Sequence, residues 1–319
     1  MKLLITGLAG FVGSVLTSVA LGLGHSVRGL DRLCFGVEPL RPYLANPRFE
    51  LVRGDIRDAG QVRRAVRGVD AVIHLAALVG VPACQRDTRE AWEVNVEGAR
   101  TLDGARPRGV PLILASTGSV YGEVEGICTE DTEPNPLSVY ARTKYEAERI
   151  LRDRGALILR FATGFGLAPR LRLDLLPNAF CYQAVHEGKL NVYEGRFRRS
   201  FIHVFDMARA LILGLDHYAE MVSRPLNVGD NALNTTKLEL AQLVARRAGA
   251  SVSVDERGHD QDQRDYEVDY RRIREAGFRT TVSLAAGIDE MVRVFMFLKE
   301  EGQWPESADH VRNAEEPEL

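Results

Sequence analysis

Short apolar runs alternate with longer amphipathic stretches along the first half of the chain. Runs such as "KLLIT" and "PLILAST" are mostly apolar, which is typical of strands buried on both faces. Between them, stretches such as "FVGSVLTSVALGLG" repeat apolar residues with the spacing of a helix. Strands that alternate with helices form a parallel sheet covered on both sides. The pattern therefore predicts a doubly wound α/β fold.

The alternation changes after about residue 165, and this divides the predicted fold into two domains. Residues 1–165 are expected to form a Rossmann-type dinucleotide-binding domain, which residues 201–227 rejoin. Residues 166–200 and 228–304 contain shorter strands and helices, and we assign them to a second, smaller α/β domain. The polar end of the chain, 305–319, is predicted to be a disordered tail.

Composition and charge narrow the class of protein. The 319 residues are 45% hydrophobic and 27% charged, as in an ordinary soluble globular protein. The net charge of −3 gives no reason to expect a nucleic acid or an anionic membrane as partner. The N-terminus has no signal-peptide pattern, and no apolar stretch is long enough to span a bilayer. The four cysteines are Cys34, Cys84, Cys128 and Cys181. They form neither metal-ligand pairs nor a disulfide framework, so we expect a cytoplasmic protein without a metal.

A glycine-rich turn, "TGLAGFVG", separates the first predicted strand from the first helix. Its glycines allow a tight turn and let backbone N–H groups approach a pyrophosphate. The residues assigned to this cofactor contact are Gly7, Gly10, Phe11, Val12 and Gly13. Asp31 ends the next strand, where a carboxylate accepts both hydroxyls of an adenosine ribose and repels a 2′-phosphate. The neighbouring Arg32 could stack on adenine or bind such a phosphate, but Asp31 favours NAD over NADP.

The ends of the next two strands supply further candidates for the cofactor site. "GDIRD" ends the third strand and places Asp55 and Ile56 near the adenine. An alternative role for Asp55 is to cap the helix that follows, and the sequence leaves both open. "HLAA" ends the fourth strand, where small side chains let a cofactor lie close. The residues assigned there are Leu75, Ala76 and Ala77.

"YARTK" places Tyr140 and Lys144 four residues apart, on one face of a predicted helix. A free tyrosine has a pKa of about 10, too high for a base at neutral pH. A neighbouring ammonium and a positively charged nicotinamide both favour the phenolate. Thr117 ends the fifth strand, and parallel strands point their C-terminal ends at one crevice. We therefore expect Thr117 and Tyr140 to reach the same ligand.

Taken together, these motifs resemble the nucleotide-sugar epimerase/dehydratase branch of the extended short-chain dehydrogenases/reductases. They occur in the family's order over about the first 210 residues, and they include "NVEG", "STGSVYG", "LRFATGFG" and "RRSFIHVFD". The resemblance implies that Thr117 binds the sugar 4-hydroxyl, that Tyr140 is the general base and that Lys144 is its electrostatic partner. It also implies NAD contacts from Asn95, Tyr140, Lys144, Phe161 and Thr163.

The same resemblance assigns the second domain to a nucleotide sugar. It places Asn178 and Arg199 at the diphosphate, with Arg264 as a further phosphate-binding arginine. An exposed basic residue on a loop is the alternative for Arg264. Asn191 and Tyr193, in "LNVYEG", match the short strand that contacts the base.

Two predicted helices, at about 87–104 and 138–154, resemble the pair through which family members dimerise. Each of them also has to cover the sheet. The resemblance therefore implies a homodimer.

The two positions after Thr117 distinguish members of this branch. In sugar 4,6-dehydratases they are typically Asp-Glu, the acid and base that remove water across C5 and C6. Here they are Gly118 and Ser119, which are neither strong acids nor strong bases and resemble the small residues of 4-epimerases. Glu123 lies just beyond and is the candidate for a substitute acid or base, the alternative being a solvated charged loop.

The leading hypothesis is an enzyme that oxidises C4 of a UDP-linked hexose or hexosamine with bound NAD and then reduces it again, giving the 4-epimer. A UDP-N-acetylhexosamine 5,6-dehydratase, as in tunicamycin antibiotic biosynthesis, would share the first step. A non-catalytic NAD-binding protein is the hypothesis from a different class. The presence of Thr117, Tyr140 and Lys144 argues against it.

Overall fold

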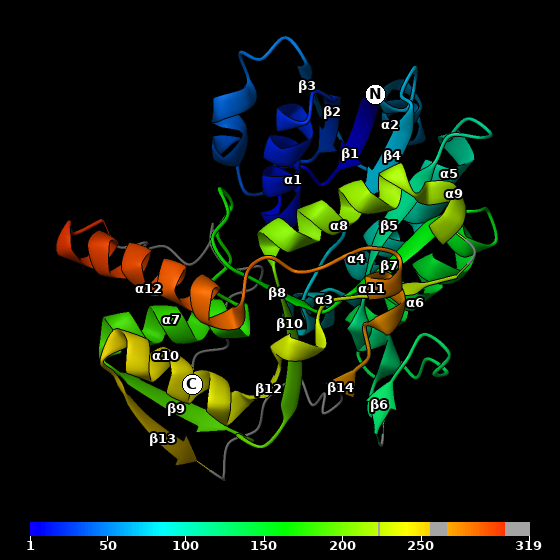
Figure 1. The fold of residues 1–319 in the computed structure, drawn as a ribbon. Coiled ribbons are helices and arrows are strands. Elements are labelled where there is room, and N and C mark those ends of the chain that lie inside the picture. The colour runs from blue at the N-terminus through cyan, green and yellow to red at the C-terminus, as the bar shows by residue number, and fades with distance from the viewer. Residues whose placement is uncertain (125, 223, 256–266, 304–319) are drawn as a thin grey trace.

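A seven-stranded parallel sheet lies at the centre of the protein, with the strand order β11-β7-β5-β4-β1-β2-β3 (Figure 1). The structure is a computed structural model that describes residues 1–124, 126–222, 224–255 and 267–303. The doubly wound fold predicted from the alternation is confirmed. The strands are β1 (Lys2–Thr6), β2 (Ser26–Asp31), β3 (Phe49–Arg53), β4 (Ala71–His74), β5 (Leu112–Thr117), β7 (Leu157–Phe161) and β11 (Leu226–Val228).

Successive side chains of each central strand point to opposite faces of the sheet. Leu3 and Ile5 of β1 belong to a hydrophobic cluster that lies under helices α1 and α8. Leu4, between them, belongs to a second cluster that lies under α2, α5 and α6. Because helices cover both faces, the strands carry apolar residues at nearly every position. The helices are α1 (Phe11–Gly22), α2 (Ala59–Ala65), α5 (Gly98–Ala105), α6 (Val139–Arg152) and α8 (Val204–Asp216).

The chain reverses its direction across the sheet at β1, which pairs with β2 on one side and with β4 on the other. A crevice forms outside the carboxyl ends of the strands at such a switch point, and ligands bind there in open α/β sheets. Gly7 and Leu75 directly follow β1 and β4, so the motifs at these strand ends meet at one edge.

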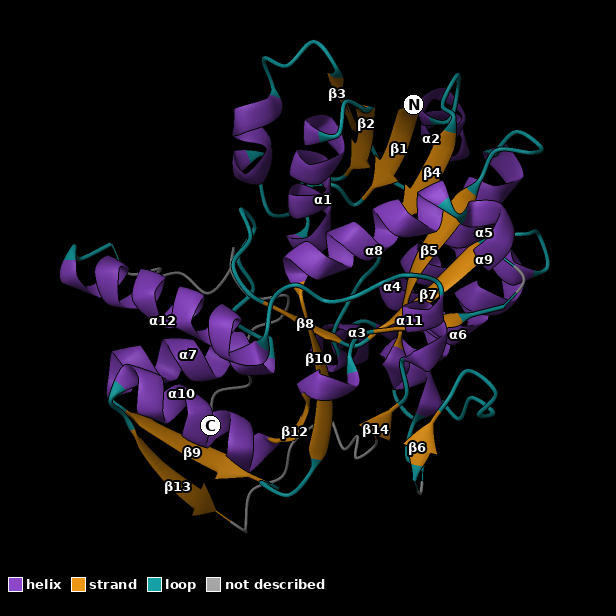
Figure 2. Ribbon diagram, in the orientation of Figure 1, coloured by secondary structure: helices purple, strands orange, loops and turns teal. Residues whose placement is uncertain are grey.

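A second group of elements packs beside the sheet (Figure 2). Strand β10 pairs with β8 in parallel and with β12 in antiparallel fashion, and β9 pairs with β13. A third hydrophobic cluster, which includes Phe165, Phe201 and Phe295, joins helices α7, α10 and α12. The bounds are β8 (Thr163–Phe165), α7 (Leu176–Glu187), β9 (Lys189–Tyr193), β10 (Arg198–His203), β12 (Asn234–Thr236), α10 (Lys237–Ala248), β13 (Ser251–Asp255) and α12 (Leu284–Glu300).

The segment 201–227 runs through both parts of the molecule. It begins in β10 of the three-stranded sheet, continues as α8 over the large sheet and ends in β11 at the edge of that sheet. The predicted tail, 305–319, lies outside the described residues. None of the helices in the described part of the chain is both long and apolar enough to cross a membrane.

Short elements make the remaining connections. Strand β14 (Glu267–Val268) pairs with β6 (Ile127–Cys128), so the later part of the chain returns to the loop that follows β5. The other short elements are η1 (Glu38–Tyr43), α3 (Val81–Arg86), α4 (Thr88–Trp92), η2 (Glu93–Glu97), η3 (Gly118–Tyr121), α9 (Tyr218–Met221), η4 (Asn231–Leu233) and α11 (Arg271–Glu275).

Candidate active site

One large cleft, with a volume of about 1280 Å³, opens at the carboxyl ends of the strands. Its walls come from the glycine-rich turn, the ends of β2, β4 and β5, the start of α6, and the second group of elements. Pockets for single small ligands are usually about 300–1,000 Å³ in volume. The cleft is therefore large enough for more than one ligand.

The glycine-rich turn has the form expected of a phosphate cradle, because it passes very close to neighbouring backbone. Gly7 has a φ of +73°, and a Cβ atom there would lie 2.7 Å from the backbone nitrogen of Ala76. A Cβ atom on Gly13 would lie 2.4 Å from the carbonyl oxygen of Gly7. Gly10 is the N-cap of α1, so the unbonded N–H groups of the first helical turn face the cleft. The cleft-lining residues of this turn include all five assigned from sequence: Gly7, Gly10, Phe11, Val12 and Gly13.

The Asp31 carboxylate is held in place at the edge of the cleft. It accepts hydrogen bonds from the backbone N–H groups of Ala9 at 3.0 Å and Leu33 at 2.7 Å. Burial raises the pKa of Asp31 from its ordinary value, which marks a carboxylate with few contacts to water. Each oxygen keeps a lone pair for a ribose hydroxyl. Together with the glycine cradle, this carboxylate fits an adenine dinucleotide without a 2′-phosphate.

The side chain of Arg32 is already engaged by carboxylates. Its guanidinium lies 2.8 Å from Glu90 and 3.6 Å from Asp55. These contacts compete with any contact to a 2′-phosphate.

Four of the five residues assigned at the ends of β3 and β4 line the cleft, and Asp55 does not. The Asp55 carboxylate instead accepts hydrogen bonds from the backbone and the guanidinium of Arg57, at 2.7–3.1 Å. The N-cap of α2 is Asp58 rather than Asp55. The structure thus excludes Asp55 as the N-cap of α2 and shows its carboxylate bonded to Arg57, while its contact with adenine stays a prediction. The lining residues at these strand ends are Ile56, Leu75, Ala76 and Ala77.

Thr117, Tyr140 and Lys144 all line the cleft. The Thr117 hydroxyl donates to Ser119 Oγ at 3.0 Å and accepts from the Ser119 N–H at 3.1 Å, which fixes its orientation at the end of β5. Helix α6 begins after the N-cap Ser138, so Tyr140 lies in its first turn at the cleft. The structure therefore brings these three side chains to the same cleft.

Lys144 is almost completely buried, with a relative exposure of 4%. Burial lowers its pKa to about 8, while the nearby Glu148 and Cys84 act in the opposite direction. An ammonium in such a site is a strong electrostatic partner for a neighbouring phenolate, because little water screens it.

Three of the residues assigned to the nucleotide sugar line the cleft. Asn191 donates to the Tyr193 hydroxyl at 3.1 Å, and both residues line the cleft. Arg199 is buried on β10, and it also lines the cleft. Arg264 lies outside the described residues. Two further lining residues that were assigned to the nicotinamide end are Phe161 and Thr163.

Asn95 and Asn178, which were assigned to ligand contacts, are not among the residues that line the cleft. Asn95 bonds to both the N–H and the C=O of Leu78, at 2.7 and 2.9 Å, from a π-helical turn that interrupts the single helix predicted over 87–104. Asn178 bonds to the N–H and the C=O of Gly166, at 3.0 and 2.9 Å. These bonds hold the two amide side chains against the backbone of Leu78 and Gly166, and their contacts with ligand stay predictions.

The position of Glu123 gives no support to its assignment as an acid or base. Its side chain is exposed on the loop that leads from η3 to β6, and it does not line the cleft. This exposed position favours the alternative, a solvated charged loop.

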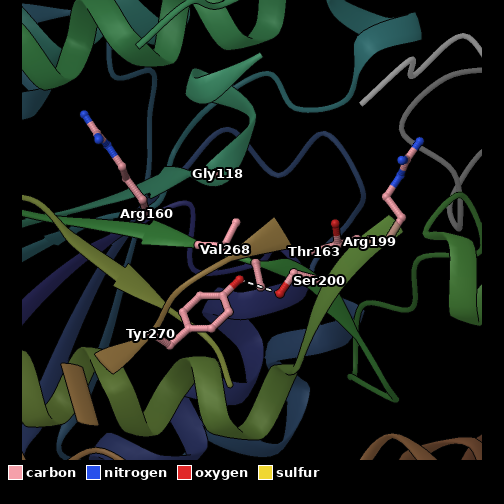
Figure 3. A pocket seen from close by; sticks show the side chains of 8 residues that line it. Gly118, Arg160, Thr163, Arg199, Ser200, Val268 and Tyr270 are labelled. Atoms are coloured by element: carbon pink, nitrogen blue, oxygen red, sulfur yellow. Dashed lines mark hydrogen bonds between the residues drawn. The ribbon is translucent and has the colours of Figure 1, made fainter. Parts of the chain in front are cut away.

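Gly118 borders a small cavity of about 10 Å³ beside the cleft. Ser200 and Tyr270 also line this cavity, and Figure 3 shows their hydroxyls bonded to each other. Thr163 lines both the cavity and the cleft, so the two spaces adjoin. A volume of about 10 Å³ holds one water molecule. A side chain longer than hydrogen at position 118 would compete for this space.

Sequence reasoning missed a buried ionic contact behind the candidate base. Glu148 and Arg160 form a salt bridge at 2.7 Å, and both side chains are 3% exposed. A signal was present in the sequence, because Glu148 follows Lys144 with the same four-residue spacing that separates Tyr140 from Lys144. Its partner on β7 could not be identified from spacing.

Comparison with known proteins places the chain in a family. Residues 3–229 match the profile of a group described as the NAD dependent epimerase/dehydratase family. The chain belongs to this family. A dTDP-glucose 4,6-dehydratase of Streptomyces griseus is 34% identical over 308 residues, which cover 90% of this chain and 91% of the relative. A UDP-glucose 4-epimerase of Corynebacterium glutamicum is 30% identical over 258 residues, with 72% and 75% covered.

Solved structures agree with this placement. DesIV, a dTDP-glucose 4,6-dehydratase from Streptomyces venezuelae whose structure contains NAD, matches with a TM-score of 0.82 at 30% identity. The match covers 96% of this chain and 99% of DesIV. The UDP-glucose 4-epimerase of Thermus thermophilus in complex with NAD matches with a TM-score of 0.79 at 28% identity, covering 92% and 99%. The protein is thus an NAD-dependent nucleotide-sugar epimerase/dehydratase, and the glycine cradle and Asp31 fit this cofactor.

Proposed function

We propose that this family member is a 4-epimerase of a UDP-linked hexose or hexosamine. One observation carries the proposal: the cleft brings together Thr117, Tyr140 and Lys144, while the next two positions, Gly118 and Ser119, bear no carboxylate. The relatives include both epimerases and dehydratases, so overall similarity does not decide between them. Function within a shared fold follows from the chemistry of the site.

The proposed reaction begins with transient oxidation at C4 of the sugar. Thr117 holds the 4-hydroxyl by a hydrogen bond, and Tyr140 accepts its proton. Lys144 stabilises the phenolate form of Tyr140 beforehand. NAD, when bound, supplies the acceptor for the hydride from C4 and its donor in the return step. Return to the opposite face of the 4-keto sugar then inverts C4.

Elimination of water would need an acid and a base near C5 and C6. Among the described residues that line the cleft, the carboxylates are Asp31, Glu90, Asp174 and Glu187. Asp31 is bonded to the glycine-rich turn, and Glu90 and Asp174 form salt bridges with Arg32 and Arg172. None of the four comes from β5, η3 or α6, the elements that carry the candidate catalytic residues. This distribution favours epimerisation.

Epimerisation also needs space, because the 4-keto sugar must present its other face to the cofactor. The cleft of about 1280 Å³, which Thr117 lines, offers space for this movement, and Gly118 adds no side chain next to Thr117. We further propose that Arg199 binds the diphosphate and that Asn191 and Tyr193 contact the base, since all three line the same cleft.

A homodimer formed through the segments at about 87–104 and 138–154 is part of the proposal. The first segment contains α4, η2 and α5, and the second contains α6. Helices α5 and α6 contact one another on the same face of the sheet. The resemblance to dimeric family members supports this assembly. Light scattering coupled to size-exclusion chromatography should give twice the mass of the chain, whereas a monomer at all concentrations contradicts it.

Product analysis tests the proposed function. The purified protein is incubated with a panel of UDP-hexoses and UDP-N-acetylhexosamines, and products are identified by mass and proton NMR. A C4 epimer of unchanged mass supports the proposal. A 4-keto product with a C6 methyl group would show a 4,6-dehydratase. A product lighter by one water, with vinyl protons and no ketone, would show a 5,6-dehydratase.

A further inference from the structure

A buried carboxylate lies one helical turn beyond Lys144. Glu148 is on the same face of α6 as Tyr140 and Lys144, because the three follow each other at four-residue intervals. Arg160 on β7 donates to both of its oxygens, with the guanidinium Nε at 3.1 Å from each and Nη2 at 2.7 Å from Oε2. Such a two-pronged contact holds the carboxylate in one orientation.

Further bonds connect this pair to the strand that carries Thr117. The Ser116 hydroxyl donates to Glu148 Oε1. Arg160 also donates to the Tyr121 hydroxyl at 3.2 Å, and Tyr121 donates to Asn227 at 2.7 Å. The mechanism outlined above uses none of these groups, yet burying a salt bridge is costly and adds little to stability on its own.

Few charges face Lys144 from the elements packed around it in the described part of the chain. Burial and the Lys144 charge lower the pKa of His74, on β4, to about 3. Burial raises the pKa of Cys84, on α3, to about 12. Both groups are therefore neutral near pH 7. Helix α6 also carries Arg142, Tyr145, Glu146, Arg149 and Arg152, but its titratable groups at four residues from Lys144, on the same face, are Tyr140 and Glu148. Glu148 is therefore the carboxylate beside Lys144.

We propose that Glu148 determines which of two side chains, Tyr140 or Lys144, is protonated when the two hold one titratable proton between them. With one proton between them, the pair exists either as phenolate and ammonium or as phenol and amine. The two forms differ by transfer of one proton between Tyr140 Oη and Lys144 Nζ, and no other reactant takes part. Glu148 favours the first form, which is the one that can accept a proton from substrate. This inference rests on the proposed role of Tyr140 as the base.

Electrostatics gives the direction and the size of the effect. Burial disfavours the ammonium of Lys144. Without Glu148, a larger share of the protein would therefore hold the pair as phenol and amine. Along the helix axis Glu148 is about 6 Å from Lys144 and about 12 Å from Tyr140. Its charge therefore stabilises the ammonium more than it destabilises the phenolate. At an effective dielectric constant of about 20, the difference changes the ratio of the two forms by up to about tenfold, part of which Arg160 offsets.

The test measures the phenolate directly and needs no substrate. The ultraviolet absorbance of the NAD-loaded protein is titrated between about pH 6 and about pH 10, and the same titration of Tyr140→Phe is subtracted to isolate Tyr140. In Glu148→Gln, the Tyr140 phenolate signal near pH 8 should fall severalfold and recover only at higher pH, where both groups lose their protons. Glu148→Asp keeps the charge and should restore most of the signal.

Asp206→Asn is the matched control for loss of a buried carboxylate. Asp206 at the start of α8 is fully buried, pairs with Arg209, and accepts bonds from Thr281 and Val282 far along the chain from α6. This variant should lower the unfolding temperature and leave the phenolate signal unchanged. Should Glu148→Gln fail to fold, the double variant Glu148→Gln with Arg160→Gln removes both charges, and it should still show a reduced signal.

The outcomes separate this inference from the proposed function. A wild-type phenolate that Glu148→Gln leaves unchanged, with only the unfolding temperature lowered, overturns the inference alone. A wild-type protein without any Tyr140 phenolate over this range removes Tyr140 as the base and overturns both.

Discussion

At the scale of single residues, the proposed mechanism depends on Tyr140, although a tyrosine ordinarily has too high a pKa to be a base at neutral pH. A free tyrosine holds its proton up to about pH 10. The structure places Tyr140 in the first turn of α6, with the buried Lys144 one turn further on, and Thr117 lines the same cleft. In the proposed mechanism, Lys144 is the charge partner of the phenolate and Thr117 is the hydrogen-bond partner of the sugar.

Removing the Tyr140 hydroxyl should abolish turnover without disturbing the fold. Positioned acid–base groups contribute ~10²–10⁴-fold to rate, so Tyr140→Phe should lose turnover by that factor. Circular dichroism and NAD titration should match the wild type. Tyr145→Phe, on the same helix but outside the cleft lining, is the control and should stay within a few-fold of wild-type turnover. An active Tyr140→Phe enzyme would remove this residue from the mechanism.

The preference for NAD over NADP is also expected to depend on a single residue, Asp31. The fixed Asp31 carboxylate should accept the ribose hydroxyls of NAD and repel the extra phosphate of NADP. Calorimetric titration of cofactor-free protein should show NAD binding roughly tenfold or more tightly than NADP, since a hydrogen bond to a charged group contributes about 1.5–3 kcal/mol. Asp31→Asn should reduce the difference in affinity between NAD and NADP. Tighter binding of NADP to the wild type would mean that Arg32 dominates.

At the scale of elements, the junction of β1 and α1 has to pass very close to neighbouring backbone. Gly13→Ala should destabilise the protein by about 1–3 kcal/mol and weaken NAD binding, because the new Cβ would lie 2.4 Å from the Gly7 oxygen. Gly22→Ala, at the other end of α1, meets no atom within 4 Å and should stabilise by about 0.5–1 kcal/mol. Urea unfolding measures both. Equal stability of the two variants would contradict the close approach at the turn.

The sequence predicted the large elements well because buried parallel strands are apolar on both faces and their helices are amphipathic. It also indicated which strand ends meet, since all carboxyl ends of a parallel sheet share one edge. The sequence could not predict which neighbouring group each side chain would contact. Asp55, Asn95 and Asn178 lie beside the cleft, but each is turned to a local partner that spacing does not reveal. The partner of Glu148 is likewise on a different element, β7.

At the scale of the whole molecule, one cleft has to hold the cofactor and the sugar together. The glycine cradle and Asp31 come from the sheet, while Arg199 and Tyr193 come from the second group of elements. A reaction that oxidises C4 and then reduces it again leaves the cofactor unchanged after each turnover. Both ligands can therefore remain side by side in a cleft of about 1280 Å³ until the product leaves.

The fate of a label at C4 tests the central claim most directly. A UDP-hexose with deuterium at C4 is converted by the purified protein, and the product is examined by mass and by proton and deuterium NMR. We predict that the deuterium remains at C4, that the configuration of C4 is inverted and that the mass is unchanged. Deuterium found at C6 of a 4-keto-6-deoxy sugar would contradict the account, because that product requires the acid–base pair that Gly118 and Ser119 replace.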